Sequence, residues 1–309
     1  MRLVADVGGT NVRFALADEA GRLAELRTYR GIDFASFADA LEHYTKVAKG
    51  MAGCNACCIG AAGPVDDGRV RLTNTTWSID RDEITRLLAG VPVTLVNDLQ
   101  AVAAALPHLV ADDVKPLGGP MPVWPANRTM LAVNIGTGFG AASAIRHGSQ
   151  WSTSPSEAGH MTLGVIEAGK SDLMPVNATI ESLFSGKGLG AFYSQLGGSD
   201  CGTTGSQVEA VDVFARAGHD AAAALALELF TACFGRVAGD LALATAAWGG
   251  VFLCGSVAVG WSAVADIKRF RTEFMRKGPM RARMEQVPTA IIRHENVSLY
   301  GLAMMPISG

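Results

Sequence analysis

The sequence predicts an α/β protein built from two related lobes, and three observations support this prediction. Residues 3–17 read as an apolar strand, a glycine turn and a second strand. Residues 130–142 repeat that plan, with Asn134-Ile135-Gly136 matching Asp6-Val7-Gly8, 128 residues earlier. The remaining segments read as strands and helices, which is typical of mixed sheets flanked by helices. We therefore expect one duplicated architecture rather than two unrelated domains.

The composition is that of a globular chain with a substantial core. Of its 309 residues, 49% are hydrophobic and 18% are charged, which suits two lobes of ordinary size. Glycine supplies 36 residues, an excess that suits tight turns and close backbone approaches. The net charge is −3, so no basic field is available for nucleic acid. Nucleic acid is therefore not an expected partner.

The termini and apolar stretches give no sign of export or of a membrane. Arg2 is the only early positive charge, and Asp6 interrupts the first apolar segment too soon for a signal peptide. Residues 241–265 carry no charge and are long enough to span a membrane. However, Gly249-Gly250 and Gly255-Ser256 divide them into a helix end, a short strand and a turn. We expect a cytoplasmic protein that does not bind membranes.

The six cysteines are expected to be reduced thiols. Cys54-x-x-Cys57-Cys58 could suggest zinc, but no second Cys or His pair follows at finger spacing. Cys57 and Cys58 also lie in an apolar run that resembles a buried strand, where cysteine packs as a small hydrophobe. No zinc site is expected.

The first part of the chain contains alternating strand and helix patterns. Apolar alternation and buried runs predict strands, and apolar residues at helical spacing predict helices, one of them led by Ser78 as N-cap. The predicted strands are 3–7, 12–17, 23–29, near 56–62, 70–73 and 93–96, and the predicted helices are 35–50, 79–88 and 99–106.

The second part begins after an irregular segment that contains proline and glycine, 107–125, which is the best linker candidate. Helices are expected to dominate 207–247, before a strand at 251–254, and the apolar segment 296–306 could return to the first lobe. We therefore predict a small lobe from residues 1–107 with about 296–309, and a large lobe from residues 108–295.

The two glycine turns are candidate phosphate sites. Neither a P-loop nor a dinucleotide fingerprint is present, because a strand follows the first glycines. Glycine lets backbone N–H groups approach a phosphate closely, and the carboxylate of Asp6 just before the turn suits a hydrated cation. The candidates are Gly8, Gly9, Thr10 and Asn11 in the first turn and Gly136, Thr137 and Gly138 in the second. Gly255-Ser256 is a third such turn, which could face an adenine or ribose or only reverse the chain.

Asn97-Asp98 lies where a buried strand meets a helix, which is where ligands bind in open α/β sheets. A carboxylate there can accept a proton from a substrate hydroxyl. Equally, Asp98 could do no more than cap its helix.

Glu157, His160 and Glu181 are candidates for binding a polyol. Glu157 and His160 are three residues apart with Gly159 between them, and both side chains can bond adjacent hydroxyl groups. A metal site is the rival interpretation, and it lacks further ligands nearby in sequence; a structural surface loop is the simplest alternative. Glu181 lies in a short helix expected to be capped by Asn177 and to end at Ser185-Gly186, where its charge could serve only the helix dipole.

Together these segments resemble the bacterial glucokinase family of the hexokinase and actin-like ATPase superfamily, nearly from end to end. The motifs are Leu3–Asn11, Gly63-Pro64, Leu72-Thr73-Asn74-x-x-Trp77, Val96-Asn97-Asp98, Gly136-Thr137-Gly138, Glu157-x-Gly159-His160, Glu181-Ser-Leu-x-Ser-Gly and Gly249-Gly250-Val251. Ser156 and Asn134 stand where many relatives have smaller residues, and neither change removes a reacting group. The cysteine-rich zinc motif of the related repressor, open-reading-frame and kinase family is absent.

The resemblance implies a fold, an activity and a set of roles. The fold would be the two-lobed actin-like or ribonuclease H-like ATPase fold, with a cleft between the lobes and usually a homodimer. The reaction would be ATP-dependent phosphorylation of D-glucose at its 6-hydroxyl, with ATP and Mg²⁺ as cofactors. Asp98 matches the catalytic base, and Asn97, Asp98, Glu157, His160 and Glu181 match the sugar ligands.

The two first glycine turns match the family's phosphate sites, and Asp6 would hold Mg²⁺ through water. A kinase for another hexose or amino sugar, use of ADP or polyphosphate as donor, a sugar sensor without catalysis, and an actin-like or chaperone ATPase remain alternatives.

Overall fold

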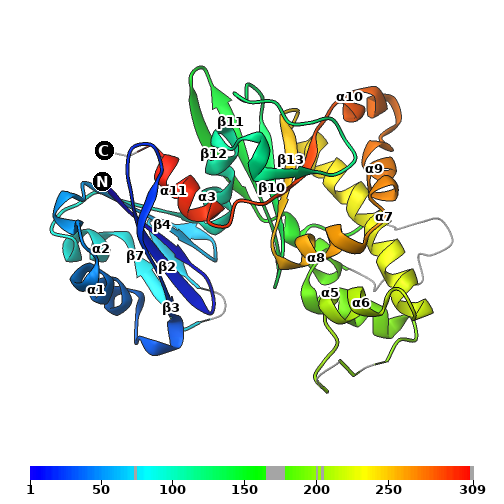
Figure 1. The fold of residues 1–309 in the computed structure, drawn as a ribbon, viewed down its shortest axis with the longest axis horizontal. Helices are drawn as coiled ribbons and strands as arrows, with labels where there is room; N and C mark the ends of the chain where they lie inside the picture. Colours follow the sequence, from blue (N-terminus) through cyan, green and yellow to red (C-terminus); the bar gives the residue numbers. More distant parts are fainter. Residues whose placement is uncertain (73–74, 165–177, 200, 203–204, 307–309) are drawn as a thin grey trace. The chain divides into compact units, whose positions relative to one another are not determined.

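The computed structural model describes residues 1–72, 75–164, 178–199, 201–202 and 205–306 (Figure 1). The chain divides into two compact units. The first consists of Met1–Leu109, Trp151–Pro155 and His294–Gly309, and the second of Val110–Gln150 and Ser156–Arg293. The sequence-based division did not include the short segment Trp151–Pro155 in the first unit, nor residues 108–109 and 294–295 at its two other boundaries.

The first unit contains a five-stranded sheet of order β3-β2-β1-β4-β8. β1 is antiparallel to β2 and parallel to β4, and β4 is parallel to β8. These strands match the predicted segments closely. Their bounds are β1 (Arg2–Val7), β2 (Asn11–Ala17), β3 (Leu23–Arg30), β4 (Ala56–Ala61) and β8 (Val93–Asn97).

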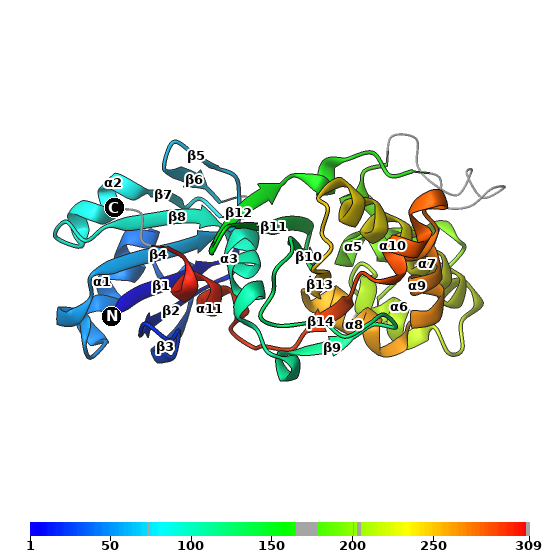
Figure 2. The same cartoon turned by 90° about the horizontal axis from the view of Figure 1, so that it is seen from above.

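Two pairs of helices cover the two faces of this sheet (Figures 1 and 2). Leu3, Ala5 and Val7 of β1 pack in one apolar cluster with α1 (Phe37–Val47) and α2 (Arg81–Leu87). Val4 packs on the opposite face with α3 (Asp98–Ala105) and α11 (Val297–Met304). Because side chains alternate along a strand, Asp6 lies on the face of α3 and α11.

Helix starts in this unit follow their capping residues. Ser36 accepts the N–H of Asp39 and starts α1, inside the predicted 35–50. The prediction that Ser78 caps the next helix is wrong, because Ser78–Asp80 forms strand β7 and Asp80 is the N-cap of α2. β7 completes a small antiparallel sheet with β5 (Val65–Asp66) and β6 (Arg69–Arg71). Residues Thr73 and Asn74 of the predicted motif lie outside the described residues.

The other large sheet has six strands in the order β12-β11-β10-β13-β14-β9 and belongs to the second unit, apart from Trp151–Pro155 of β12, which is grouped with the first. β10 is antiparallel to β11 and parallel to β13, and β13 is parallel to β14, so the plan of the first sheet is repeated. The expected duplication is therefore confirmed at the level of strand order. The bounds are β9 (Val114–Pro116), β10 (Met130–Ile135), β11 (Phe139–His147), β12 (Gln150–Ser156), β13 (Gly250–Cys254) and β14 (Thr289–Ile292).

The segment 107–125 is more ordered than the predicted linker. Val114–Pro116 within it forms β9, which pairs antiparallel with β14 at the edge of the second sheet. Three-residue 3₁₀ helices occur here and at other turns of the chain, at Gly31–Asp33, Met51–Gly53, Leu106–His108, Ala111–Asp113, Ala158–His160 and Gly278–Met280.

An aromatic core joins the helices of the second unit to its sheet. Phe234 packs between Phe184, Trp261 and Phe270, and the indole N–H of Trp261 donates to Thr231 Oγ1 at 2.9 Å. The helices are α4 (Ile180–Leu183), α5 (Gly186–Gln195), α6 (Ala210–Arg216), α7 (Ala221–Ala244), α8 (Ser256–Val264), α9 (Ile267–Met275) and α10 (Arg281–Glu285).

The apolar stretch 241–265 contains the predicted helix end, in α7, and the predicted strand, β13, and the predicted turn at Gly255-Ser256 leads into helix α8, which was not predicted from the sequence. Within the described residues, α7 alone is long and apolar enough to cross a membrane, and 67% of its most apolar 18 residues are buried inside the unit. That burial is what the core helix of a globular unit shows.

Candidate active site

The first glycine turn is closed by its own backbone. Gly8 N–H donates to Asn11 O at 3.0 Å, and Thr10 O accepts the N–H of Gly31 at 2.8 Å. In the described part of the chain, the N–H groups of Gly9 and Thr10 donate to no backbone oxygen. Gly8 thus shapes the turn, and Gly9 and Thr10 are the residues whose N–H groups remain for an anion.

The second glycine turn is built in the same way. Gly136 N–H donates to Gly138 O at 3.0 Å, and Thr137 is exposed at the tip. The carbonyl of Gly136 accepts the N–H of Gly186, the first residue of α5, at 3.0 Å. The positive end of a ten-residue helix therefore adjoins this turn, and such an end favours bound anions.

Gly255 brings the third turn against the end of β10. Its φ is +93°, and a Cβ there would overlap Ile135 O and Asn134 Oδ1. Only glycine fits this position, because both the backbone conformation and the space exclude a side chain. Ser256 then starts α8. The structure thus brings two of the predicted nucleotide segments, 136–138 and 255–256, together at the carboxyl ends of the neighbouring strands β10 and β13.

Glu181 lies beside the second turn. It is in the first turn of α4, but its Oε2 accepts the N–H of Phe139 at 2.8 Å, which ties α4 to the start of β11. A Cβ on Gly138 would lie 2.5 Å from the same oxygen. The helix is capped by Thr179, whereas the expected cap, Asn177, lies outside the described residues.

Glu157 precedes the 3₁₀ helix Ala158–His160, and His160 is the last residue of that helix. Both side chains are exposed, by 68% and 71%, and Glu157 Oε2 lies 4.0 Å from His160 Nε2. A Cβ on Gly159 between them would lie 2.7 Å from Phe139 O, so the segment packs on the start of β11. The segments that carry three of the five predicted sugar ligands therefore meet at the backbone of Phe139 in the second unit. These ligands are Glu157, His160 and Glu181.

The other two predicted sugar ligands, Asn97 and Asp98, lie in the first unit. Asn97 is the N-cap of α3: its Oδ1 accepts the N–H of Leu99 at 2.9 Å, and Gln100 Oε1 accepts the N–H of Asn97 at 3.1 Å. The amide of Asn97 also donates to Gly63 O at 3.1 Å. Asp98 is the first residue of the helix, so the capping role falls to its neighbour.

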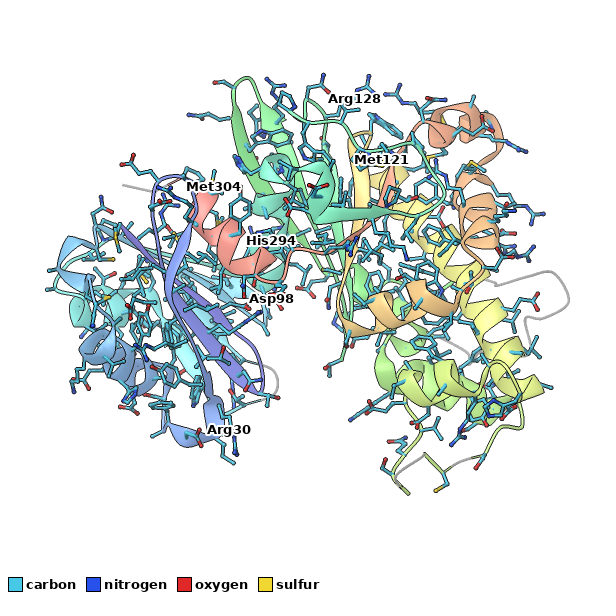
Figure 3. The ribbon with its side chains drawn as sticks, viewed as in Figure 1. Arg30, Asp98, Met121, Arg128, His294 and Met304 are labelled. Carbon is cyan, nitrogen blue, oxygen red and sulfur yellow. The ribbon has the colours of Figure 1, made fainter. Side chains whose placement is uncertain are left out.

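Asp98, which is labelled in Figure 3, lies at the start of α3, and its carboxyl group has an unusual environment. Burial, and after it the negative charge of Asp6, raises the pKa of Asp98 to about 6. A carboxyl with a pKa near neutrality can take up and release protons under physiological conditions, which is the property that a general base needs.

Asp6 has two partners on one of its oxygens. Its Oδ2 forms an ion pair with Arg13 and accepts the hydroxyl hydrogen of Ser298 at 2.9 Å. No described residue donates to Oδ1. Carboxylate oxygens suit Mg²⁺, which keeps most of its waters and is usually held by one or two carboxylates with substrate phosphates. Asp6 fits that role through Oδ1.

Sequence reasoning missed Arg13 and Ser298. Arg13 is the cross-strand partner of Asp6 in the β1–β2 hairpin, so the register of the two predicted strands could have found it. Ser298 is 292 residues from Asp6 along the chain, and no local pattern marks that contact.

The repeated strand order of the two sheets and the glycine turn in each define an actin-like ATPase fold. Known structures share this fold. A glucokinase from an Antarctic psychrotroph superposes with a TM-score of 0.84 at 28% identity, over 98% of this chain and 97% of its own. A ROK family glucokinase from Streptomyces griseus, solved in complex with glucose and AMPPNP, superposes with a TM-score of 0.63 at 21% identity, over 97% and 98% of the two chains.

The sequence comparisons narrow the assignment from this fold to one protein family. The glucokinase family model matches residues 3–307. A glucokinase from Caulobacter sp. strain K31 is 33% identical over 98% of this chain and 94% of its own length. A protein of Burkholderia pseudomallei strain 1710b named "Bifunctional protein glk" is also 33% identical, and this chain spans 48% of its length. The chain belongs to the glucokinase family.

Proposed function

We propose that this protein is a hexose kinase that transfers the γ-phosphoryl group of Mg-ATP to the 6-hydroxyl of D-glucose. The observation that carries the proposal is Asp98, a carboxyl with a pKa of about 6 at the end of a buried strand, in the unit that also bears the first glycine turn. Family membership and the fold shared with a glucokinase solved with glucose and AMPPNP support the choice of substrates.

Phosphoryl transfer asks the protein mainly for positioning and for charge stabilisation. The N–H groups of Gly9, Thr10, Thr137 and Gly138 hold the phosphates, and Gly8 and Gly136 keep the two turns closed. Gly255-Ser256 contacts the nucleoside part of ATP. Asp6 would hold Mg²⁺ through water, and the ion would supply positive charge against the phosphates.

The sugar is held by hydrogen-bonding groups and activated by a carboxylate. Glu157, His160 and Glu181 bind ring hydroxyls, and Asn97 adds an amide to that set. Asp98 orients the 6-hydroxyl and takes up its proton as the phosphoryl group arrives. Exclusion of water from the site would keep ATP from being hydrolysed instead.

The larger assembly is also part of the proposal. The first unit corresponds to the small lobe of residues 1–107 with about 296–309, and the second to the large lobe of residues 108–295. The active form is a cytoplasmic homodimer, and its product enters glycolysis.

A sugar panel tests the proposed function. Turnover with Mg-ATP is measured by coupled assay for glucose, mannose, glucosamine and no sugar, with ADP and polyphosphate as alternative donors. We expect glucose to give the highest kcat/KM. A higher value for another sugar would assign a different hexose kinase. Tight glucose binding without turnover would indicate a sensor, and equal ATP hydrolysis without sugar would indicate an ATPase of another class.

A further inference from the structure

We propose that Ser298 is a positioning residue that fixes the carboxylate of Asp6 by holding Oδ2, so that Oδ1 stays free for a water of the Mg²⁺ ion. This inference rests on the proposed function, which assigns Asp6 to the Mg²⁺ shell. It adds a role for α11, a helix in which the sequence marks no functional residue.

The first step of the argument is the geometry at Oδ2. Ser298 Oγ donates to this oxygen at 2.9 Å, and Arg13 from the neighbouring strand is ion-paired with the same oxygen. Hydrogen bonds to a charged group are directional and stronger than neutral ones. With both donors on Oδ2 and none of the described residues on Oδ1, the two carboxylate oxygens have separate surroundings.

The second step is the rigidity of the donor. Ser298 is 7% exposed, and the adjacent Leu299 is fully buried. One turn further along α11, a Cβ on Gly301 would overlap Ala101 O of α3, so the two helices pack at close range. The hydroxyl of Ser298 is thus held by a helix that cannot shift, whereas Arg13 has a long side chain that is 36% exposed.

The third step is the charge around Asp6. Two charged groups interact with Asp6: Arg13 on β2 and Asp98 at the start of α3. On β4, the residue paired with Asp6 is the uncharged Gly60. Arg13 neutralises the carboxylate, but its long, partly exposed side chain can move with the carboxylate and fixes its direction less well than a buried hydroxyl does. Ser298 adds no charge, and its contribution is therefore the direction of the carboxylate. Residues that orient a metal-binding carboxylate typically change metal affinity by about 10- to 100-fold when removed.

The binding test uses the Ser298→Ala variant of the full chain and calorimetric titration with AMPPNP, with and without Mg²⁺. We expect about tenfold weaker binding of Mg·AMPPNP and unchanged binding of metal-free AMPPNP. Ser143→Ala is the matched control, because Ser143 is also buried, at 6% exposed, on β11 in the second unit, and no hydrogen bond among the described residues joins its side chain to a candidate residue. Ser298→Cys, with a thiol that donates weakly, gives a second variant of nearly native volume and should also weaken binding.

The second readout needs neither metal nor turnover. Crystal structures of the ligand-free native protein and of Ser298→Ala are compared at Asp6. Without the Ser298 hydroxyl on Oδ2, the carboxylate of Asp6 should rotate away from its native orientation. Ser143→Ala should keep the native orientation of Asp6.

The outcomes separate this inference from the proposed function. Unchanged Mg·AMPPNP affinity, or an Asp6 carboxylate that keeps its native orientation in Ser298→Ala, overturns the role of Ser298 even if glucose is phosphorylated normally. Conversely, a native protein that binds Mg·AMPPNP but phosphorylates no sugar refutes the proposed function alone, and the two readouts still decide the role of Ser298. A native protein that binds no Mg·AMPPNP refutes both.

Discussion

At the scale of single residues, Asp98 shows a conflict between stability and chemistry. Its carboxyl lies at the start of α3, where it is removed from water and repelled by Asp6. Both effects oppose ionisation, so the free energy of unfolding is lower when Asp98 is charged than when it is neutral. A general base must nevertheless be charged in order to accept a proton.

Replacing Asp98 with asparagine tests its role as the base. Asp98→Asn keeps the size of the side chain and removes the proton acceptor, so kcat with glucose should fall by at least ~10²-fold, the usual scale for an acid–base group. Asp66→Asn makes the same change at an exposed position of the first unit and should leave kcat as it is. Near-normal turnover in Asp98→Asn would refute the assignment.

The pH dependence of turnover follows from the raised pKa. In the proposed mechanism Asp98 acts in its ionised form, so kcat/KM should fall as the pH drops through about 6, the pKa that burial and Asp6 give it. An unperturbed aspartate would keep its activity down to about pH 4. A pH–rate profile with saturating Mg-ATP makes the measurement, and an acid limb near pH 4 would contradict this environment for Asp98.

The same pKa predicts a stability gain in the inactive variant. Because the folded-state pKa of about 6 exceeds the ordinary 3.8, the Asp98 carboxyl favours folding below pH 3.8 and loses that contribution as the pH rises to 6. Asp98→Asn should therefore be about 1–3 kcal/mol more stable than the native protein at pH 7.5 and no more stable near pH 4. Urea unfolding at both pH values tests this, and an equal difference at the two would exclude the titration as its cause.

How much of the site the sequence predicts depends on whether a contact is local. Asp6 and Asp98 can be found because each follows a buried apolar run. The capping role of Asn97 is also local, since its partners lie two and three residues on. Ser298 reaches Asp6 through the return of α11 to the first sheet, and such long-range contacts leave no periodic pattern in the chain.

At the scale of elements, buried strands are easier to predict than edge strands and helix starts. β1, β4 and β10 are apolar over most of their length because both faces of the strand are covered. β9 has three residues and lies at a sheet edge, so tertiary pairing rather than composition makes it a strand. The wrong N-cap prediction at Ser78 has a similar origin. Ser78 and Asp80 both precede the helix and could both cap it, but Ser78 pairs with β6 as part of β7, which leaves Asp80 as the cap.

The junction of β10, β13 and α8 depends on one glycine. Gly255→Ala would force a Cβ into the end of β10 at a φ of +93°, so it should lower the free energy of unfolding by more than about 2 kcal/mol and weaken nucleotide binding. Gly90→Ala is the control for conformation alone: its φ is +89° and nothing lies within 4 Å of the added methyl group. Its cost should stay near 1 kcal/mol. Equal costs in urea unfolding would show that steric overlap at Gly255 does not matter.

At the scale of the whole molecule, the duplicated sheets give each unit a turn of the same kind with a different side chain before it. The first unit places Asp6 before its turn, and the second places Asn134 at the equivalent position. A charged carboxylate is thus supplied by one copy and a neutral amide by the other. We infer that the two copies divide the work, with the carboxylate chemistry in the first unit and most sugar contacts in the second.

That division predicts how ligands stabilise the intact protein. A ligand at 100 times its Kd raises the free energy of unfolding by about 2.7 kcal/mol, so glucose and Mg·AMPPNP should each raise Tm. Glu157→Gln should reduce the shift caused by glucose and leave that of Mg·AMPPNP, without lowering the unliganded Tm, because the Glu157 side chain is 68% exposed. Glu228→Gln makes the same change on an exposed part of α7 and should preserve both shifts. Loss of the nucleotide shift in Glu157→Gln, or an unaltered glucose shift, would contradict the assignment of Glu157 to the sugar.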